Sequence, residues 1–198
     1  SIRYSHPKWL ADEFARRLGV EEAEALLEAD NGEPPTCAQV NTLKTTAEAL
    51  ATSLKSQGVE AESHPWLPNC LLLRHTGSLE GLEEFQRGLF YIQDAAARLA
   101  VTAADPRPGM RVLDACAAPG GKSFAAAIAM GDRGEVVSCD IHPHKEKLIQ
   151  AGAARLGLTC IRTEVLDGKS CKEEFLDSFD LVIADVPCSG LGIIRKQP

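Results

Sequence analysis

Residues 113–123, LDACAAPGGKS, decide the fold of this 198-residue chain. The apolar start predicts a short buried strand that ends at Asp114, and the two glycines predict a tight turn into a helix. The neighbouring pattern supplies further candidate strands (111–115, 136–140, 159–164 and 181–185) and candidate helices (122–130 and 144–156). Strands that alternate with helices in this way form parallel sheets, because each strand needs a crossover to reach the next. We therefore expect an α/β, Rossmann-like open sheet over residues 105–198.

Two smaller regions precede this sheet. Residues 1–33 have apolar side chains at helical spacing, with Gly19 as a stop, and are expected to form a helical linker segment. Residues 34–104 predict a small α+β module, with strands at 37–41, 70–74 and 89–93 and helices at 46–57 and 95–104. The turn residues at 105–109 mark the expected boundary with the Rossmann-like region.

The small module is typical of four-stranded sheets that face RNA. Phe90 and Tyr91 are its only adjacent aromatic pair, and we interpret them as core residues rather than as a stacking platform. The net charge of −7 argues against a nucleic-acid partner, because phosphate neutralisation needs a basic surface. An RNA-binding hypothesis therefore requires basic side chains gathered on one face.

Cysteine usage and hydropathy further restrict the class of protein. The seven cysteines form no C-x-x-C pair, which disfavours a disulfide framework and a zinc site, so we expect no metal and a reducing cytoplasm. No run of about 18 apolar residues is present, and the first residues are not typical of a signal peptide. We expect no membrane partner, and a monomer.

The glycine-rich loop allows several interpretations. The G-x-G-x-x-G spacing of dinucleotide sites is absent, and a phosphate loop would need glycine where Cys116 stands, although Gly121-Lys122-Ser123 matches its end. A plain turn without a ligand also stays open. The interpretation that we favour is an S-adenosylmethionine site, because Asp140 ends the next strand and can accept both ribose hydroxyls.

A second motif, DVPCSG at residues 185–190, follows the last apolar strand. Pro187 cannot donate a ladder hydrogen bond, so we expect Cys188 in a turn at the carboxyl end of the strand, where open sheets bind ligands. A thiolate that adds to carbon 6 of a pyrimidine makes carbon 5 nucleophilic towards a methyl group. Asp185 is placed to hydrogen-bond the N3 edge of the ring. An inert buried thiol is the alternative interpretation of Cys188.

Together, the DACAAPGGK and DVPCSGLG motifs, with Arg3-Tyr4-Ser5-His6-Pro7 and Gln93-Asp94 upstream, resemble the Sun/Fmu (Nop/Sun) family of RNA cytosine-5 methyltransferases. The resemblance is strongest to bacterial enzymes that act on 16S rRNA. It implies a class I S-adenosylmethionine-dependent methyltransferase domain preceded by an RNA-binding module of RRM-like shape. The cofactor contacts that it implies are Cys116, Ala117, Ala118, Pro119, Gly120, Gly121, Lys122, Asp140, Asp167 and Asp185.

The resemblance also implies two catalytic cysteines. The one that matches Cys188 assists release of the methylated product, and the nucleophile lies in a later T-C-S motif that this sequence lacks. A helical domain similar to the NusB antiterminator would precede Ser1. We therefore expect the central portion of an enzyme that lacks its C-terminal strands and is inactive by itself. A tRNA methyltransferase, a non-catalytic RNA- or cofactor-binding protein and a nucleotide hydrolase stay open as alternatives.

Overall fold

The computed structural model describes residues 2–32, 34–170, 172–188 and 190. The chain divides into two compact units. The first consists of Ser1–Pro35 with Pro187–Pro198, and the second of Thr36–Val186. The boundaries predicted from the sequence at residues 33/34 and 104/105 stay predictions.

The first unit contains short helices: η1 (Ile2–Tyr4), α1 (Lys8–Leu18) and α2 (Val20–Asp30). Gly19 separates α1 from α2 with a φ of 87°, which an L side chain rarely adopts. Leu10 of α1 and Ala23 and Leu27 of α2 are buried. The predicted helical character of this region and its stop at Gly19 are confirmed.

The second unit begins with a βαββαβ module: β1 (Thr36–Val40), α3 (Ala47–Ser56), β2 (Glu60–Ser63), β3 (Cys70–Arg74), η2 (Leu79–Gly81), α4 (Glu83–Gln86) and β4 (Phe90–Ile92). Its strands pair antiparallel in the order β2-β3-β1-β4, which is a ferredoxin-like sheet. The predicted four-stranded α+β module is confirmed. The sequence pattern missed β2, because Glu60–Ser63 is almost entirely polar and only Ala61 is buried.

Both faces of this antiparallel sheet are covered around β4. Phe90 is fully buried in a cluster with Leu50 and Leu54 of α3. Tyr91 points to the other face and packs edge-on against Phe124, with 5.9 Å between ring centroids. The interpretation of both rings as core residues is confirmed. The sheet is not open to RNA at Tyr91, because helical side chains occupy that place.

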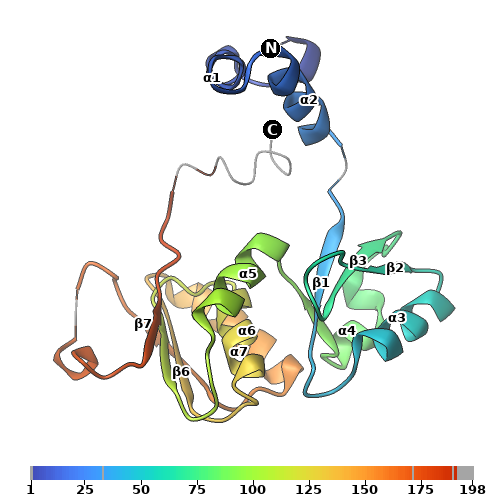
Figure 1. Cartoon of the computed structure of the whole chain (residues 1–198). Coiled ribbons are helices and arrows are strands. Elements are labelled where there is room, and N and C mark those ends of the chain that lie inside the picture. Colours follow the sequence, from blue (N-terminus) through green and yellow to red (C-terminus); the bar gives the residue numbers. More distant parts are fainter. Residues whose placement is uncertain (1, 33, 171, 189, 191–198) are drawn as a thin grey trace. The chain divides into compact units, whose positions relative to one another are not determined.

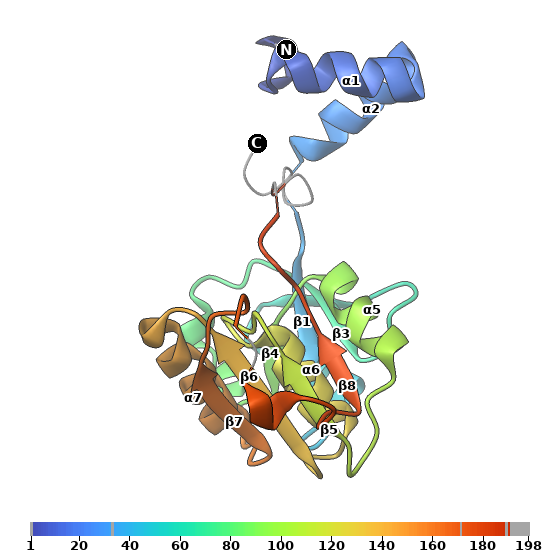
Figure 2. The same cartoon turned by 90° about the vertical axis from the view of Figure 1, so that its left-hand side faces the viewer.

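The second half of the unit contains α5 (Ala95–Ala104), β5 (Arg111–Asp114), α6 (Gly121–Ala129), β6 (Glu135–Asp140), α7 (Pro143–Leu156), β7 (Ile161–Val165), η3 (Glu173–Phe175) and β8 (Leu181–Ile183). Its strands are all parallel in the order β7-β6-β5-β8 (Figure 2). The predicted Rossmann-like α/β sheet, preceded by a small α+β module, is confirmed.

Two strands of the parallel sheet differ by two residues at one end from their predicted bounds, for local reasons. β8 ends at Ile183 rather than at residue 185, because its ladder partner β5 ends opposite it at Asp114. β7 begins at Ile161 rather than at residue 159. The backbone N–H groups of Thr159 and Cys160 donate to the Asp132 carboxylate instead of to a strand.

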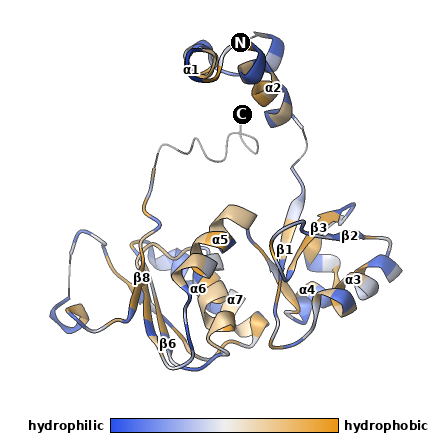
Figure 3. Ribbon diagram, viewed as in Figure 1, coloured by the Kyte–Doolittle hydropathy of each residue, from blue (hydrophilic) through white to orange (hydrophobic). Residues whose placement is uncertain are grey.

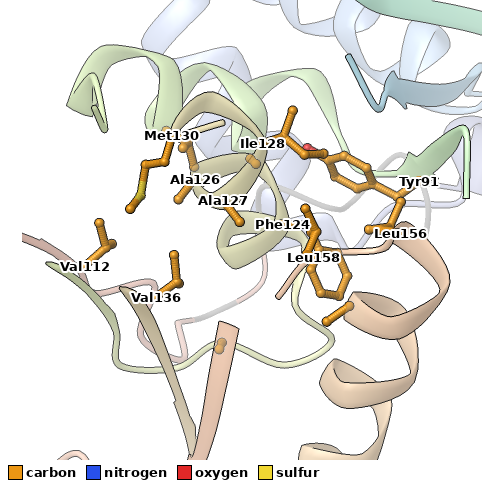
Figure 4. Packing of buried hydrophobic residues seen from close by; sticks show 14 of the residues in the cluster. Tyr91, Val112, Phe124, Ala126, Ala127, Ile128, Met130, Val136, Leu156 and Leu158 are labelled. Carbon is orange, nitrogen blue, oxygen red and sulfur yellow. The ribbon is translucent and has the colours of Figure 1, made fainter. Parts of the chain in front are cut away.

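The helices α5, α6 and α7 cover one face of the parallel sheet and lie between it and the antiparallel sheet (Figure 1). The core beneath them is formed by the strand valines Val112 and Val136, by apolar side chains of α6 such as Phe124, and by Met130, which follows α6 (Figure 4). The hydrophobic colouring of α5 and α6 contrasts with the polar stretches of α3 and α4 (Figure 3). Among the described residues, no helix combines the length and hydropathy needed to span a membrane.

Candidate functional site

The candidate site lies at the carboxyl edge of the parallel sheet. The chain passes from β5 to β6 and β7 on one side, and β8 pairs with β5 on the other side. The strand order therefore reverses at β5, and open α/β sheets bind ligands at such a switch point. Asp114 ends β5 and Asp140 ends β6, so parallel pairing brings both carboxylates to the same edge.

The glycine-rich loop connects β5 to α6 in a tight turn. Ala117 N donates to Cys139 O at 2.8 Å and Gly120 N donates to Ala117 O at 2.7 Å, which fixes the loop against β6. Gly120 has a φ of 112°, and a Cβ there would lie 2.4 Å from Cζ of Phe124. Only glycine fits this position. The loop leads to the N-terminus of α6 at Gly121, where the first backbone N–H groups have no intrahelical acceptor.

Asp114 is a site residue that the sequence analysis did not single out. Its side chain is fully buried and accepts from Ser123 Oγ at 2.7 Å, and Ser123 in turn accepts from Ser138 at 2.7 Å. Burial raises the pKa of Asp114 from 3.8 to about 6, and the Ser123 hydrogen bond opposes the rise. The sequence contains a signal for Asp114, because this residue ends an apolar strand. A carboxylate is as costly to bury there as at Asp140.

Asp140 is almost fully buried where β6 ends, with 8% of its surface exposed. Its Oδ1 accepts from His142 N at 3.0 Å and lies 3.8 Å from Lys145 Nζ. The pKa of Cys116 is raised, first by burial and then by the charges of Asp140, Asp114 and Asp185. The carboxylates of Asp114, Asp140 and Asp185 thus lie close to the glycine-rich loop, and Lys145 and Lys122 lie beside the last two.

Lys122 and Asp185 form an ion pair across the switch point. The distance from Lys122 Nζ to Asp185 Oδ2 is 2.5 Å. Lys122 lies in the first turn of α6 and its side chain is 18% exposed, whereas Asp185 follows β8 and its side chain is 60% exposed. The sequence analysis placed both residues in the site, and the structure brings them into contact.

Gln93 is another neighbour of the loop. A Cβ added to Gly121 would lie 3.1 Å from Gln93 Nε2, so the amide packs directly against the start of α6. Gln93 is buried, and its backbone carbonyl oxygen accepts from Gln39 Nε2 at 3.0 Å. The small module therefore contacts the loop through the segment that joins its last strand to α5.

Two further predicted site residues, Asp167 and Cys188, have local contacts of their own. Asp167 is exposed in a turn after β7, where its Oδ1 accepts from Lys169 N at 3.0 Å. Cys188 is exposed and belongs to the first unit, and its Sγ accepts from Gly190 N at 3.4 Å. The roles assigned to both residues stay predictions.

Two family models match the chain. One is described as 16S rRNA methyltransferase RsmB/F and matches residues 101–198. The other is the ferredoxin-like domain of RsmF/B-like methyltransferases and matches residues 6–80. The chain belongs to this methyltransferase family. The resemblance inferred from the motifs at the two strand ends is thereby confirmed.

Individual relatives agree with this family membership. The chain is 40% identical to a probable ribosomal RNA small subunit methyltransferase B of Bacillus subtilis, over 98% of the chain and 43% of that protein. It is 31% identical to ribosomal RNA small subunit methyltransferase B of Klebsiella pneumoniae, over 99% of the chain and 45% of that protein. The chain thus spans less than half the length of these relatives.

The fold is also similar to that of a solved structure. A methyltransferase homolog protein from Pyrococcus horikoshii superposes with a TM-score of 0.83 at 30% identity. The match covers 98% of the present chain and 63% of the Pyrococcus horikoshii protein. It therefore includes both the ferredoxin-like module and the parallel sheet.

Proposed function

We propose that this chain binds S-adenosylmethionine at the carboxyl edge of the parallel sheet and provides part of a site for methyl transfer to carbon 5 of a cytosine in RNA, with 16S rRNA as the substrate. The observation that carries the proposal is the convergence of Asp114, Asp140 and Asp185 on the glycine-rich loop, in a chain whose family comprises rRNA methyltransferases.

The chemical groups at the carboxyl edge of the parallel sheet fit this cofactor. S-Adenosylmethionine carries a sulfonium and an ammonium group, and both are favoured where carboxylates gather. Asp140 at the end of β6 is positioned as the acceptor for the ribose hydroxyls. The backbone N–H groups at the start of α6 are suited to a carboxylate. When bound, the cofactor supplies an electrophilic methyl group.

The same charges argue against the nucleotide-hydrolase alternative. A triphosphate would enter an edge already surrounded by three carboxylates, which repel it. The lysine of the apparent phosphate-loop ending, Lys122, pairs with Asp185. These contacts favour a cationic ligand over an anionic one.

For the transfer itself, we propose roles for the residues that follow β8. Asp185, in its protonated form, donates a hydrogen bond to N3 of the cytosine and stabilises the negative charge that develops on the ring. Lys122 pairs with the carboxylate that remains. A cysteine thiolate adds to carbon 6, carbon 5 takes the methyl group, and loss of the carbon 5 proton with release of the thiolate restores the aromatic ring. Cys188 is assigned to this release step.

Calorimetric titration with S-adenosylmethionine tests the cofactor site, with Asp140→Ala as the variant. We expect saturable binding that weakens by about 10- to 100-fold in the variant, because a hydrogen bond to a charged group is lost. Asp12→Ala, an exposed aspartate of α1 in the first unit, is the matched control and should bind as the parent does.

Equal affinity in Asp140→Ala and the parent would show that the ribose assignment is wrong. Binding of ATP with Mg²⁺ in place of S-adenosylmethionine would favour the hydrolase alternative.

A second experiment tests the chemistry in the full-length protein. Cys188→Ala should accumulate a covalent protein–RNA adduct with 16S rRNA, visible as a band of reduced mobility on denaturing gels. Absence of the adduct in a variant that still binds RNA would remove Cys188 from product release. Preferential methylation of tRNA would instead identify the other substrate class.

A further inference from the structure

The C-terminus of α7 receives hydrogen bonds from a distant part of the chain. A helix leaves its last carbonyl oxygens without intrahelical partners. The Arg155 carbonyl accepts from Lys44 Nζ at 3.1 Å, and the Leu156 carbonyl accepts from Asn41 Nδ2 at 2.9 Å. Both donors belong to the loop between β1 and α3 of the ferredoxin-like module. The small module therefore caps a helix of the parallel-sheet half.

The same two side chains also hold the segment that precedes β4. Lys44 Nζ donates to Arg87 O at 2.9 Å, and Asn41 Nδ2 donates to Gly88 O at 3.0 Å. Asn41 is fully buried. Each donor thus joins two backbone segments that lie far apart in sequence, one from each half of the unit.

Arg155 of α7 donates in the opposite direction, to backbone carbonyls of the ferredoxin-like module. Its Nη1 donates to Phe85 O at 2.6 Å and to Phe90 O at 3.0 Å, and its guanidinium lies 3.8 Å from the centroid of the Phe85 ring. Gly88 brings the two backbones into direct contact, since a Cβ there would lie 2.0 Å from Arg155 O. These contacts form the joint between the two halves of the unit. It consists of polar contacts from Asn41, Lys44 and Arg155 around the close backbone approach at Gly88.

The cations at this joint, Lys44 and Arg155, donate to backbone carbonyl oxygens. Burial lowers the pKa of Arg155 and of Lys44, and for Lys44 the charges of Arg155 and Arg87 add to the effect. Within residues 34–170, neither Lys44 nor Arg155 forms an ion pair with a carboxylate. The negative end of the α7 dipole offsets part of the cost of burying these cations.

We propose that Asn41 and Lys44, with Arg155, form an interdomain clamp that makes the antiparallel and parallel sheets one cooperative body. The clamp holds the far end of α7, the helix that begins three residues after Asp140. Asn41 and Lys44 are positioning residues, because they act on the site through α7. If the proposed function holds, the clamp presents RNA bound by the small module to the cofactor edge in one orientation.

Urea unfolding followed by two regional probes tests the clamp. Trp66 lies in the turn between β2 and β3 and reports on the antiparallel sheet, with Trp9→Phe as the background that removes the other tryptophan. Hydrogen exchange of the β5 and β6 amides reports on the parallel sheet. In the parent, the two probes should give one coincident transition.

Lys44→Met and Asn41→Ala should separate the two transitions by about 0.5–1 M urea, because each removes donors that join the halves. Lys44→Arg should restore coincidence, since the cation is kept. Lys55→Met, which removes an exposed lysine of α3 in the same module, is the matched control and should leave the transitions together.

Coincident transitions that merely shift to lower urea in the clamp variants would overturn the proposal, because an ordinary stabilising contact predicts that result. Should Asn41→Ala fail to fold, the exposed Lys44 position still decides the question. The measurement uses neither RNA nor cofactor, so its failure is distinguishable from failure of the proposed function.

Discussion

The two sheets of the second unit have the same number of strands and opposite roles. The parallel sheet directs every strand's carboxyl end to one edge, and Asp114, Asp140 and Asp185 meet there. The antiparallel sheet alternates its strand ends and buries Phe90 and Tyr91 on opposite faces. Strand direction therefore distinguishes a half that gathers carboxylates at one edge from a half that buries aromatic side chains on both faces of its sheet.

The largest expected effect lies at the joint between the halves. Gly88→Ala should reduce the free energy of unfolding by about 3 kcal/mol or more, since its Cβ would overlap the Arg155 carbonyl and its φ is positive. Urea denaturation measures the loss. Gly58→Ala is the matched control, with a positive φ and nothing within 4 Å, and should cost about 1 kcal/mol. Equal losses in the two variants would mean that the close approach at Gly88 contributes nothing.

Replacement of Gly120, in the glycine-rich loop, should affect both stability and ligand binding. Gly120→Ala should lower the free energy of unfolding by about 2–3 kcal/mol and also abolish S-adenosylmethionine binding, because the new methyl group would displace Phe124 beneath the loop. Calorimetry on the folded fraction separates the two effects. Gly81→Ala, which has open space around it, should change neither quantity. Retained affinity in Gly120→Ala would show that the loop conformation is not required by the ligand.

The buried carboxylate of Asp114 predicts a pH dependence of stability that is opposite in sign to that of Glu84 in the antiparallel half, whose pKa is lowered. Its folded-state pKa of about 6 lies above the ordinary value of 3.8, so between these values the folded protein keeps a proton that the unfolded chain has lost. The contribution of Asp114 to stability should therefore fall as the pH rises from about 4 to about 6, by about 3 kcal/mol in total. Urea midpoints across this range measure the slope. Asp114→Asn should flatten it, and an unchanged slope would assign the effect to other groups.

The smallest effect is expected for the ion pair at the switch point. Asp185→Ala should change the free energy of unfolding by less than about 1 kcal/mol, because an exposed carboxylate in an ion pair contributes little to stability. A double-mutant cycle with Lys122→Met measures the coupling. A coupling energy well above that bound would mean that the pair supports the fold rather than the ligand.

Local sequence signals determined the elements that depend on near neighbours. The strand at residues 136–140 and the stop at Gly19 were predicted because each signal acts within a few residues of the chain. The two motifs at strand ends identified the family, and the position of Asp140 followed from the strand that it ends. The polar strand Glu60–Ser63 was missed, since its only buried side chain is Ala61.

Tertiary structure alone decided the joint and the electrostatics of the edge. Asn41 and the Leu156 carbonyl are 115 residues apart, and no periodicity in the sequence links a donor to an acceptor at that separation. The raised pKa of Asp114 depends on burial, which is created only when α6 packs over β5. The sequence by itself thus determined the strands, the turns and the chemical groups available. The packing of one half against the other decided which of these groups meet, because side-chain contacts over long separations exist only in the folded chain.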